Sequence, residues 1–372
     1  MSILLFSAGA FCVLFCTGVV YQRIGARRDA RRYAANGRHI EIGNHRRLYV
    51  RQSGTGSPAV IFEAGIAASS LNWFHIQEQV SRFAAAVSYD RCGLGWSGPC
   101  RTLRTPRNVA LELHEMLERS GIKPPYLLVG HSFGGLVMRR FALLFPDEVA
   151  SLILIDPMRC DEWPPVNRTK QGDLRRAKKM CRYAILIAHI GLARIGITSL
   201  LCGKGMLSGR LARLAGDGTQ HVLGRVDQEV AKLPMEIRPA IAAQWSRPGF
   251  YAGMHAHLSA IPATVTEMLE LEPIADTPVL VFTPDSAPPL SWNHLREIGD
   301  NVKQVIVPNS RHWVHLDQPG IVVELIREAV ESARRAAARE ASGRIDDEYA
   351  GASIAAPGGE WEAAAVAERH SV

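Results

Sequence analysis

The chain has 372 residues, of which 47% are hydrophobic and 21% are charged. This length and composition suit one large domain with an insertion, or two smaller domains, and they exclude a chain that lacks a packed core. The seven cysteines are odd in number and show no CxxC spacing, so they indicate neither a disulfide framework nor a zinc site. We interpret them as reduced, mostly buried thiols of a cytoplasmic compartment.

The net charge of +7 has a local origin. Five arginines crowd into a short segment near the N-terminus: Arg23, Arg27, Arg28, Arg31 and Arg32. Charge that is confined to one short segment favours a membrane-facing collar over a nucleic-acid-binding surface, so we expect no nucleic-acid partner. We interpret residues 23–37 as a basic juxtamembrane linker.

Residues 1–22 carry no charged side chain, and the stretch from Ile3 to Tyr21 is apolar over nearly the length that spans a bilayer as a helix. A secretory signal would place its positive charges before the apolar stretch, whereas here the arginines follow it. The segment is therefore predicted to be an uncleaved, single-pass transmembrane anchor. Since cytoplasmic loops attract Lys and Arg, we expect the rest of the chain on the cytoplasmic side. A cleaved signal sequence or a peripheral amphipathic segment is the alternative.

Short apolar runs dominate the pattern that follows. Two alternating runs flank a Gly43-Asn44 pair, which predicts an antiparallel hairpin over residues 38–50. Six nearly continuous runs then occupy residues 59–62, 85–89, 126–129, 152–155, 279–282 and 304–307. Such runs are typical of parallel strands that are buried on both faces, and helix-like stretches separate most of them. The sequence therefore predicts an α/β fold with a mostly parallel sheet and helices on both faces.

One interval breaks this alternation. Between Asp156 and Thr277 lie about 120 residues without a convincing strand, including an apolar helix-like stretch at 183–201. Charged and polar residues interrupt that stretch, so a helix packed on the core is favoured over a second membrane span. We interpret residues 159–276 as a helical cap or lid over one end of the sheet.

The remaining boundaries follow from these assignments. The core consists of residues 38–158 before the cap and residues 277–335 after it. From about Ala333 onward the chain is rich in Ala, Gly and charge and poor in large apolar side chains, so we expect a frayed helix and a disordered tail, which we assign to residues 336–372.

A serine between glycines marks the join of the run at 126–129 with a helix-like segment. Residues 130–134, GHSFG, match the pattern G-x-S-x-G. A strand that turns sharply into a helix strains the central residue and brings its neighbours too close for side chains, so glycines flank it. This turn exposes the Ser132 hydroxyl at a helix N-terminus, where free N–H groups favour the negative charge of acyl transfer. Ser132 is therefore the predicted nucleophile.

A serine hydroxyl needs a base within hydrogen-bond reach and an acid that orients the base. His312 follows the last apolar run and precedes the final helix-like segment. A loop at the carboxyl edge of the sheet can bring it to Ser132, so we predict that His312 is the base. His315 is interpreted as a packing or hydrogen-bonding residue.

Four motifs in this order resemble the α/β-hydrolase superfamily: IFEAGIAASSLNW (61–73), SYDRCGLGWSG (88–98), VGHSFGG (129–135) and SRHWVHLDQP (310–319). The resemblance covers roughly residues 38–335. It implies the α/β-hydrolase fold and an oxyanion hole built from the backbone N–H groups of Ile66 and Phe133. Because residue 132 is serine, the resemblance points away from branches with an aspartate nucleophile, such as haloalkane dehalogenases and epoxide hydrolases.

The triad acid has two candidates. The commonest family pattern places an aspartate a few residues past the strand that follows the cap; Ala287 stands there, and Asp285 comes two residues early. Some family members supply the acid from the preceding strand, where this chain has Asp156. We favour Asp156, because a strand terminus fixes the acid against the imidazole better than a loop of shifted length. Asp285 is the alternative.

Together these features predict a membrane-anchored serine hydrolase that forms an acyl-enzyme and uses no metal or organic cofactor. An anchor and an apolar cap suit a small ester or lipid-like substrate. The alternative is a catalytically silent hydrolase-like scaffold that binds a lipid or protein partner. The intact Ser132 and His312 argue against that alternative.

Overall fold

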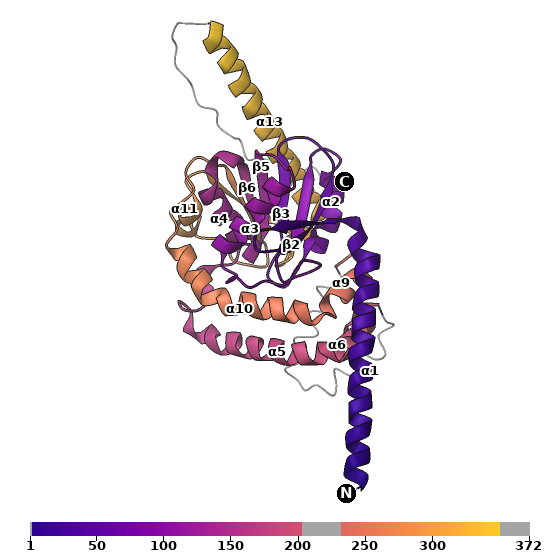
Figure 1. Ribbon diagram of the computed structural model, residues 1–372. Coiled ribbons are helices and arrows are strands. Elements are labelled where there is room, and N and C mark those ends of the chain that lie inside the picture. Colours follow the sequence, from indigo (N-terminus) through magenta and orange to yellow (C-terminus); the bar gives the residue numbers. More distant parts are fainter. Residues whose placement is uncertain (1, 203–231, 350–372) are drawn as a thin grey trace. The chain divides into compact units, whose positions relative to one another are not determined.

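The computed structural model describes residues 2–202 and 232–349 (Figure 1). Within these ranges an eight-stranded sheet has the strand order β1-β2-β4-β3-β5-β6-β7-β8. β3 to β8 run parallel, and the β1–β2 hairpin joins them through an antiparallel pairing of β2 with β4. The strands are β1 (Arg38–Ile42), β2 (Arg46–Ser53), β3 (Ala59–Glu63), β4 (Ala86–Asp90), β5 (Tyr126–His131), β6 (Val149–Ile155), β7 (Val279–Pro284) and β8 (Val302–Val307). The predicted mostly parallel sheet is confirmed.

The apolar runs become strands because the sheet buries them on both faces. Every residue of β3 and β5 is buried. Alternate side chains enter two separate hydrophobic clusters: Ile61 and Leu128 lie in one, and Val60 and Leu127 lie in the other. All six predicted runs are parallel strands, and Asn44, at φ 62°, closes the predicted hairpin.

Helices cover both faces of this sheet (Figure 1). On one face, side chains such as Val109, Val137 and Leu295 pack into the first cluster; on the other, Ile76 and Val322 pack into the second. The helices of the first face are α3 (Pro106–Arg119), α4 (Phe133–Leu144) and α11 (Trp292–Ile298), and those of the second are α2 (Phe74–Val80) and the first part of α13 (Pro319–Tyr349).

The cap leaves the sheet after β6 and returns before β7. Its described helices are α5 (Gln171–His189), α6 (Leu192–Cys202), α9 (Arg238–Trp245) and α10 (Pro248–Leu269). α10 packs along α5, as Figure 1 shows. In its described part the interval 159–276 contains helices and no named strand, while residues 203–231 lie outside the described ranges.

The single helix expected over residues 183–201 is wrong. α5 ends at His189, α6 begins at Leu192, and the chain bends by 99° between them. Gly191 makes the bend at φ +78°, and a Cβ there would lie 2.7 Å from the ring of Tyr21. Glycine adopts this backbone conformation and fits this space, so the helix ends there.

The N-terminal helix α1 (Ser2–Tyr33) continues through the arginine cluster. The predicted linker at residues 23–37 is therefore wrong over residues 23–33, which are helical because Ala and Arg favour a helix that is already nucleated. Phe11 and Leu14 in the first part of α1 are 68% and 72% exposed. The helix is long and apolar enough to cross a membrane, a property that signal sequences share.

The C-terminal prediction is corrected as well. α13 continues to Tyr349, so the tail expected to be disordered from residue 336 is helical as far as residue 349. Ala, Arg and Glu dominate this segment, and all three are strong helix formers. The described residues from Arg334 to Tyr349 belong to a unit separate from the preceding chain. Residues 350–372 lie outside the described ranges.

The cysteines are less buried than expected. Cys12 and Cys16 are exposed on α1, and Cys100 and Cys160 are partly exposed. The prediction of mostly buried thiols is therefore wrong for the described part of the chain. A helix of this length and composition places its apolar side chains outward, which explains why Cys12 and Cys16 are exposed.

Candidate active site

Ser132 occupies a strained turn between β5 and α4, which we call the elbow (residues 130–134). Its backbone has φ 53° and ψ −119°, and its N–H donates to the carbonyl of Ile155 at 3.0 Å. A Cβ on Gly130 would lie 2.5 Å from the Gly134 carbonyl oxygen, and one on Gly134 would lie 2.5 Å from the Glu63 carbonyl oxygen. The two glycines therefore permit the close backbone approach that this turn requires.

His312 and Asp156 meet at the carboxyl edge of the sheet. His312 lies in the loop between β8 and the short helix α12 (Val314–Asp317), and its Nδ1 is 2.6 Å from Asp156 Oδ2. The Asp156 N–H donates to the Phe282 carbonyl at 2.8 Å, which ties the end of β6 to β7. A carboxylate accepts, so Nδ1 carries the proton and Nε2 is left free to act as a base.

Asp285 makes different contacts. Its carboxylate accepts the N–H groups of Asn309 at 2.7 Å and Ser310 at 3.1 Å, and these hydrogen bonds lower the pKa of the carboxyl group. These two residues belong to the loop that leads to His312. Asp285 thus holds the backbone of the loop, whereas Asp156 contacts the imidazole.

A cavity of about 320 Å³ opens where these side chains meet. Five of the six predicted site residues line it: Ile66, Ser132, Phe133, Asp156 and His312. The cap and the loop after β7 complete the wall with Met158, Trp163, Leu258, Ile261, Pro288 and Leu290, and Arg159 and Glu162 add charge. Asp285 is not among the lining residues.

The predicted oxyanion donors lie on two tight backbone features. Residues 65–68 form a turn in which the Ala68 N–H donates to the Gly65 carbonyl at 3.2 Å, with Ala67 at φ 66°. Ile66 is the second residue of this turn, a position whose N–H takes no part in the turn's hydrogen bond. Phe133 is the first residue of α4, and a first-turn N–H has no acceptor within its own helix.

The buried side chain of Arg91 supports this turn. The sequence predicts that Arg91 pairs with a charge or with backbone to stabilise its own loop, but not that it holds the turn at residues 65–68. Its Nη1 lies 2.7 Å from Glu63 Oε1 and donates to the Ala64 carbonyl at 2.5 Å, and its Nη2 donates to the Gly65 carbonyl. The guanidinium also lies 5.2 Å from the Phe133 ring centroid. Arg91 therefore touches the elements that carry both predicted oxyanion donors.

Burial shapes the charges of this cluster. Desolvation raises the pKa of Glu63, and the charge of Arg91 opposes that shift. The Tyr89 hydroxyl donates to the same carboxylate. The neighbouring Asp90 accepts the N–H groups of Ser70 and Trp96, as expected of a residue that stabilises its loop. A charged pair at the ends of two adjacent buried strands is the sequence signal that could have identified Arg91 and Glu63.

Two buried histidines flank His312. His131 Nε2 donates to the His312 carbonyl at 2.8 Å, and burial lowers the pKa of His131 well below its ordinary value. His315 stacks on Trp73 with ring centroids 4.5 Å apart, and burial lowers its pKa to about 3. Both rings are therefore neutral near pH 7, and His315 has the packing environment expected for it.

The fold and the elbow have counterparts in known proteins. A family model described as alpha/beta hydrolase fold matches residues 58–177. The uncharacterized protein YqjL of Bacillus subtilis (strain 168) is 32% identical over 106 residues, which cover 28% of this chain and 42% of that protein. The chain thus matches less than half the length of this relative.

Solved structures extend the similarity to most of the chain. The epoxide hydrolase CorEH without ligand has a TM-score of 0.59 at 18% identity and covers 78% of this chain and 97% of its own. A thermophilic esterase from Thermogutta terrifontis, with malate bound, has a TM-score of 0.55 at 20% identity. The match covers 80% of this chain and 99% of the esterase chain. At these identities the two structures share the fold with this chain.

Proposed function

We propose that this chain, a member of the α/β-hydrolase superfamily, is a membrane-anchored serine hydrolase that acts on ester-like substrates. The observation that carries the proposal is that Ser132 and the His312–Asp156 pair line one cavity. A hydroxyl on a strained elbow, an imidazole and a carboxylate on Nδ1 are the parts that activate a serine.

These groups support a two-step acyl transfer. Ser132 Oγ attacks the ester carbonyl carbon while its proton moves to His312 Nε2, and Asp156 stabilises the imidazolium that forms. The bond to the leaving oxygen breaks as Nε2–H protonates it, which leaves an acyl-enzyme on Ser132. A water molecule then attacks the acyl carbon, gives its proton to Nε2, and releases the acid with Ser132 restored.

The backbone N–H groups of Ile66 and Phe133 would receive the negative charge of each tetrahedral intermediate. Both belong to backbone that packing already holds: a turn anchored by Arg91 and the first turn of α4. Donors that are fixed in advance need no reorganisation during the reaction, and losing one typically costs about 100- to 1,000-fold in kcat.

The cavity favours a lipophilic substrate of moderate size. Its walls away from Ser132 are mostly apolar, from the residues around Trp163, from α10 and from the loop after β7. A volume of about 320 Å³ is at the small end of ligand sites. We therefore propose that it accepts a short or medium acyl or alkyl chain.

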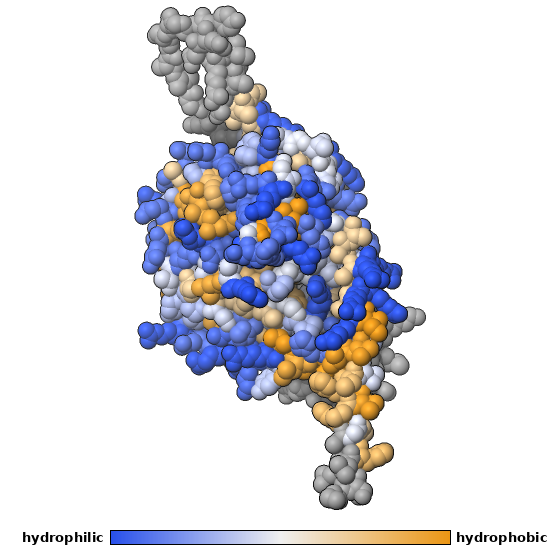
Figure 2. Space-filling model, viewed as in Figure 1, coloured by the Kyte–Doolittle hydropathy of each residue, from blue (hydrophilic) through white to orange (hydrophobic). Residues whose placement is uncertain are grey.

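Membrane anchoring rests on two apolar surfaces. Exposed apolar side chains cover the first part of α1: Phe6, Phe11, Val13, Leu14 and Phe15. Others surround the α5–α6 bend: Tyr183, Leu186, Ile187, Leu192 and Ile195. Figure 2 shows hydrophobic side chains gathering at the lower right, where α1 passes α6 in Figure 1. Exposed apolar area of this kind suits lipid contact.

The second part of α1, from Gln22 to Asp29, forms hydrogen bonds and an ion pair with the cap. Arg194 of α6 is buried; its Nε donates to Gln22 Oε1 at 2.9 Å and its Nη1 lies 2.5 Å from Asp29 Oδ2. Gln22 Nε2 in turn donates to the Ser246 carbonyl at 2.9 Å. These contacts favour an uncleaved helix, because the residues after the apolar stretch are part of the folded unit. The arginine cluster after the apolar stretch supports a cytoplasmic catalytic domain.

A fluorophosphonate probe on the full-length protein in membranes tests the chemistry. We expect covalent labelling and ester hydrolysis, and both should vanish in Ser132→Ala. Ser286→Ala removes an exposed serine from the loop after β7 and is the matched control that keeps both. Undiminished labelling of Ser132→Ala would refute the proposed nucleophile.

Carbonate extraction tests the anchor. Leu14→Lys places a charge within the apolar part of α1, which costs about 2.5–3.5 kcal/mol at the centre of a membrane helix, so it should shift protein into the extract. Leu111→Lys makes the same change on exposed α3 and should stay in the pellet. If both variants partition alike, the membrane-spanning assignment is wrong.

A further inference from the structure

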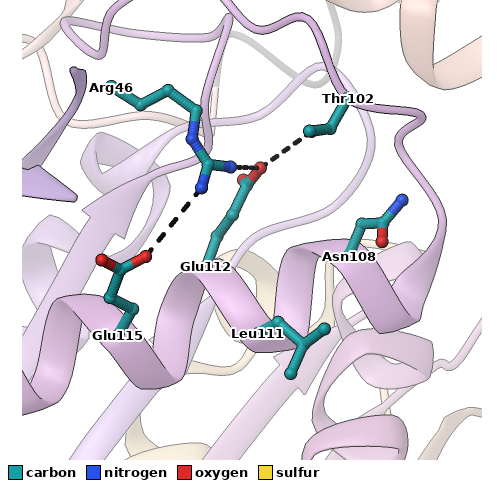
Figure 3. Close-up of a pocket in the computed structure, with 6 residues that line it drawn as sticks. All are labelled: Arg46, Thr102, Asn108, Leu111, Glu112 and Glu115. Carbon is teal, nitrogen blue, oxygen red and sulfur yellow. Dashed lines mark hydrogen bonds and ion pairs between the residues drawn. The ribbon is translucent and has the colours of Figure 1, made fainter. Parts of the chain in front are cut away.

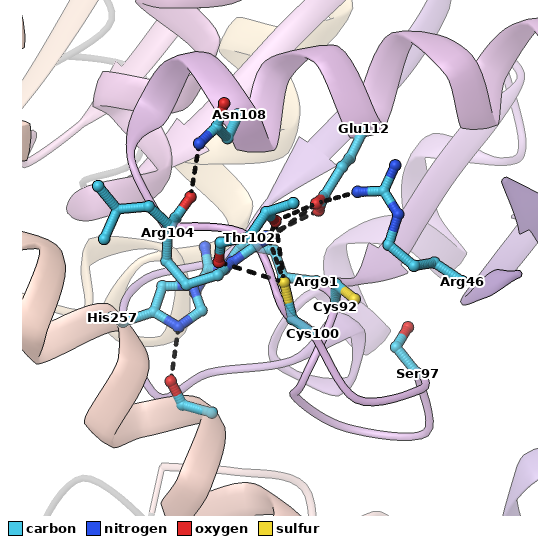
Figure 4. Close-up of polar contacts among 12 residues, drawn as sticks. Arg46, Arg91, Cys92, Ser97, Cys100, Thr102, Arg104, Asn108, Glu112 and His257 are labelled. Carbon is cyan, nitrogen blue, oxygen red and sulfur yellow. Dashed lines mark hydrogen bonds and ion pairs between the residues drawn. The ribbon is translucent and has the colours of Figure 1, made fainter. Parts of the chain in front are cut away.

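Two cysteines meet outside the active-site cavity. Cys92 follows β4 and is buried, and Cys100 lies in the same loop, between β4 and α3, and is partly exposed. Their sulfur atoms and a carboxylate oxygen of Glu112 all lie within 4.8 Å of one another. Figure 4 shows both thiols beside Arg104 and Thr102.

The surroundings of Cys100 stabilise a thiolate. Arg104 Nη1 lies 2.8 Å from its sulfur, and Thr102 Oγ1 lies 3.1 Å away. The neighbouring Cys92 thiol is the largest influence that lowers the pKa of Cys100, and the charge of Arg104 adds to it. The pKa of Cys92 is raised. Cys100 is thus the nucleophilic sulfur, and Cys92 keeps its proton.

The charges of the cluster agree with this assignment. Glu112 pairs with Arg46 at 2.5 Å and with Arg104 at 2.8 Å, so two guanidinium groups share one carboxylate. Glu115 contacts Arg46 only at 3.9 Å. An ionised Cys100 supplies the second negative charge and brings this mostly buried group close to neutrality.

A metal ion fits this cluster poorly. Cys92, Cys100 and Glu112 are chemically suited to a soft divalent cation. However, Arg104 Nη1 lies 2.8 Å from both the Cys100 sulfur and Glu112 Oε1. The guanidinium therefore occupies the place that a cation would take, and the thiols are left to their own chemistry.

An open cavity lies beside the thiol cluster, and Cys100 itself is partly exposed. Figure 3 shows this cavity, which has a volume of about 160 Å³ and is lined by Arg46, Thr102, Asn108, Leu111, Glu112 and Glu115. Thr102 and Glu112 belong to both the cavity wall and the thiol cluster. One exposed side chain, Thr102, thus connects the cavity with the Cys100 sulfur.

From this geometry we propose that Cys92 and Cys100 form a reversible oxidation site for hydroperoxides. The Cys100 thiolate attacks the terminal peroxide oxygen, the O–O bond breaks, and the departing alkoxide or hydroxide takes a proton, which leaves Cys100 as a sulfenic acid. Cys92 then attacks that sulfur; the S–S bond forms, and the departing hydroxide leaves as water with the Cys92 proton. The two thiols are oxidised by two electrons, and the hydroperoxide is reduced to an alcohol and water.

Peptide mass spectrometry of the full-length protein, treated with cumene hydroperoxide at neutral pH, tests the proposal. We expect a 92–100 disulfide that dithiothreitol removes. Cys92→Ser should stop at a sulfenic acid that dimedone traps on Cys100, whereas Cys100→Ser should give no dimedone adduct at residue 92. Cys181, buried in α5, is the internal control and should react at least about 10-fold more slowly than Cys100.

Three outcomes would overturn the proposal. One is a dimedone adduct on Cys92 rather than Cys100. Another is disulfide formation no faster than the oxidation of Cys181. The third is purified protein that holds stoichiometric zinc and loses it in Cys100→Ser, because the pair would then be a metal site.

Thr102→Val, a change at an exposed residue, should slow trapping at Cys100 by about threefold if the hydroxyl stabilises the thiolate.

Discussion

Asp156 Oδ2 lies 2.6 Å from His312 Nδ1, although 156 positions separate the two residues in the chain. The sheet creates this contact: β7 lies between β6 and β8, so the end of β6 and the loop after β8 reach the same edge. The contact fixes one imidazole nitrogen as a donor and presents the other to the cavity that contains Ser132.

Asp156→Asn should lower kcat of ester hydrolysis by about 10,000-fold while the protein stays folded. An amide can donate to Nδ1, so it favours the tautomer that carries its proton on Nε2 and cannot act as base. Steady-state kinetics with a short-chain ester, together with circular dichroism, measure this effect.

Asp285→Asn is the matched change for that experiment. The Asp285 carboxylate accepts two backbone N–H groups in the loop before His312. Because an amide accepts these hydrogen bonds less well, Asp285→Asn should lower the thermal stability somewhat but change kcat little. A large kcat loss in Asp285→Asn with a near-normal Asp156→Asn would transfer the role of the acid to Asp285.

Arg91 should act as a positioning residue for the oxyanion turn. Arg91→Lys keeps the charge but not the simultaneous contacts with the Ala64 and Gly65 carbonyls. We expect kcat to fall by about 10-fold or more with KM nearly unchanged, because a donor displaced from the intermediate affects the transition state.

A double variant separates this role from stability. Arg91→Met leaves the buried Glu63 carboxylate unpaired, which typically costs about 3–5 kcal/mol of unfolding free energy. Glu63→Gln combined with Arg91→Met removes that charge and should recover much of the stability, but not kcat. Recovery of kcat along with stability would mean that Arg91 is structural alone.

The elbow should be intolerant of side chains at its glycines. Gly134→Ala would place a Cβ 2.5 Å from the Glu63 carbonyl oxygen, which is backbone and cannot move freely, so we expect a loss of about 2 kcal/mol or more. Gly172→Ala, in α5 with no atom within 4 Å of the new Cβ, should instead gain about 0.5–1 kcal/mol. Urea unfolding measures both; equal effects would refute the packing at the elbow.

His315 should make the fold sensitive to acid. Its pKa is about 3 in the folded protein against an ordinary value of 6.5, so the unfolded chain binds more protons between these pH values. Stability is therefore fully present above about pH 6.5 and falls as the pH drops toward 3. His315→Phe keeps the stacking on Trp73 and should reduce this slope by about 1.4 kcal/mol per pH unit between pH 4 and 6.

His131 is also buried and neutral, so the His315→Phe variant should retain part of the acid sensitivity. The comparison is made by urea unfolding at pH 5 and pH 8. An unchanged difference between the two pH values in His315→Phe would show that His315 is hydrated or protonated in the folded state.

The local pattern of apolar residues and glycines in the sequence was sufficient to predict most of the fold. Continuous apolar runs determine parallel strands because both faces of the sheet bury them, and the six runs are β3 to β8. The glycines around Ser132 determine the elbow, since the turn excludes side chains there. These features depend on residues within a few positions of one another, so the sequence alone is enough to predict them.

Other predictions failed where distant segments meet. The helix over 183–201 breaks at Gly191, which packs against Tyr21 of α1. In the expected linker Ala and Arg favour a helix, and the contact of Asp29 with Arg194 of α6 adds a tertiary interaction that holds it. Helical propensity could not reveal either contact, because both join segments more than 150 positions apart.

The site divides in the same way. Short motifs were enough to predict Ser132 as nucleophile and His312 as base. The preference for Asp156 over Asp285 as the partner of His312 depends instead on which strand end lies beside the imidazole. Arg91 and the Cys92–Cys100 pair are likewise defined by contacts that the chain makes on folding. The sequence determines which chemical groups the chain carries. The packing of the whole sheet sets the distance between two such groups, and that distance decides which groups can react together.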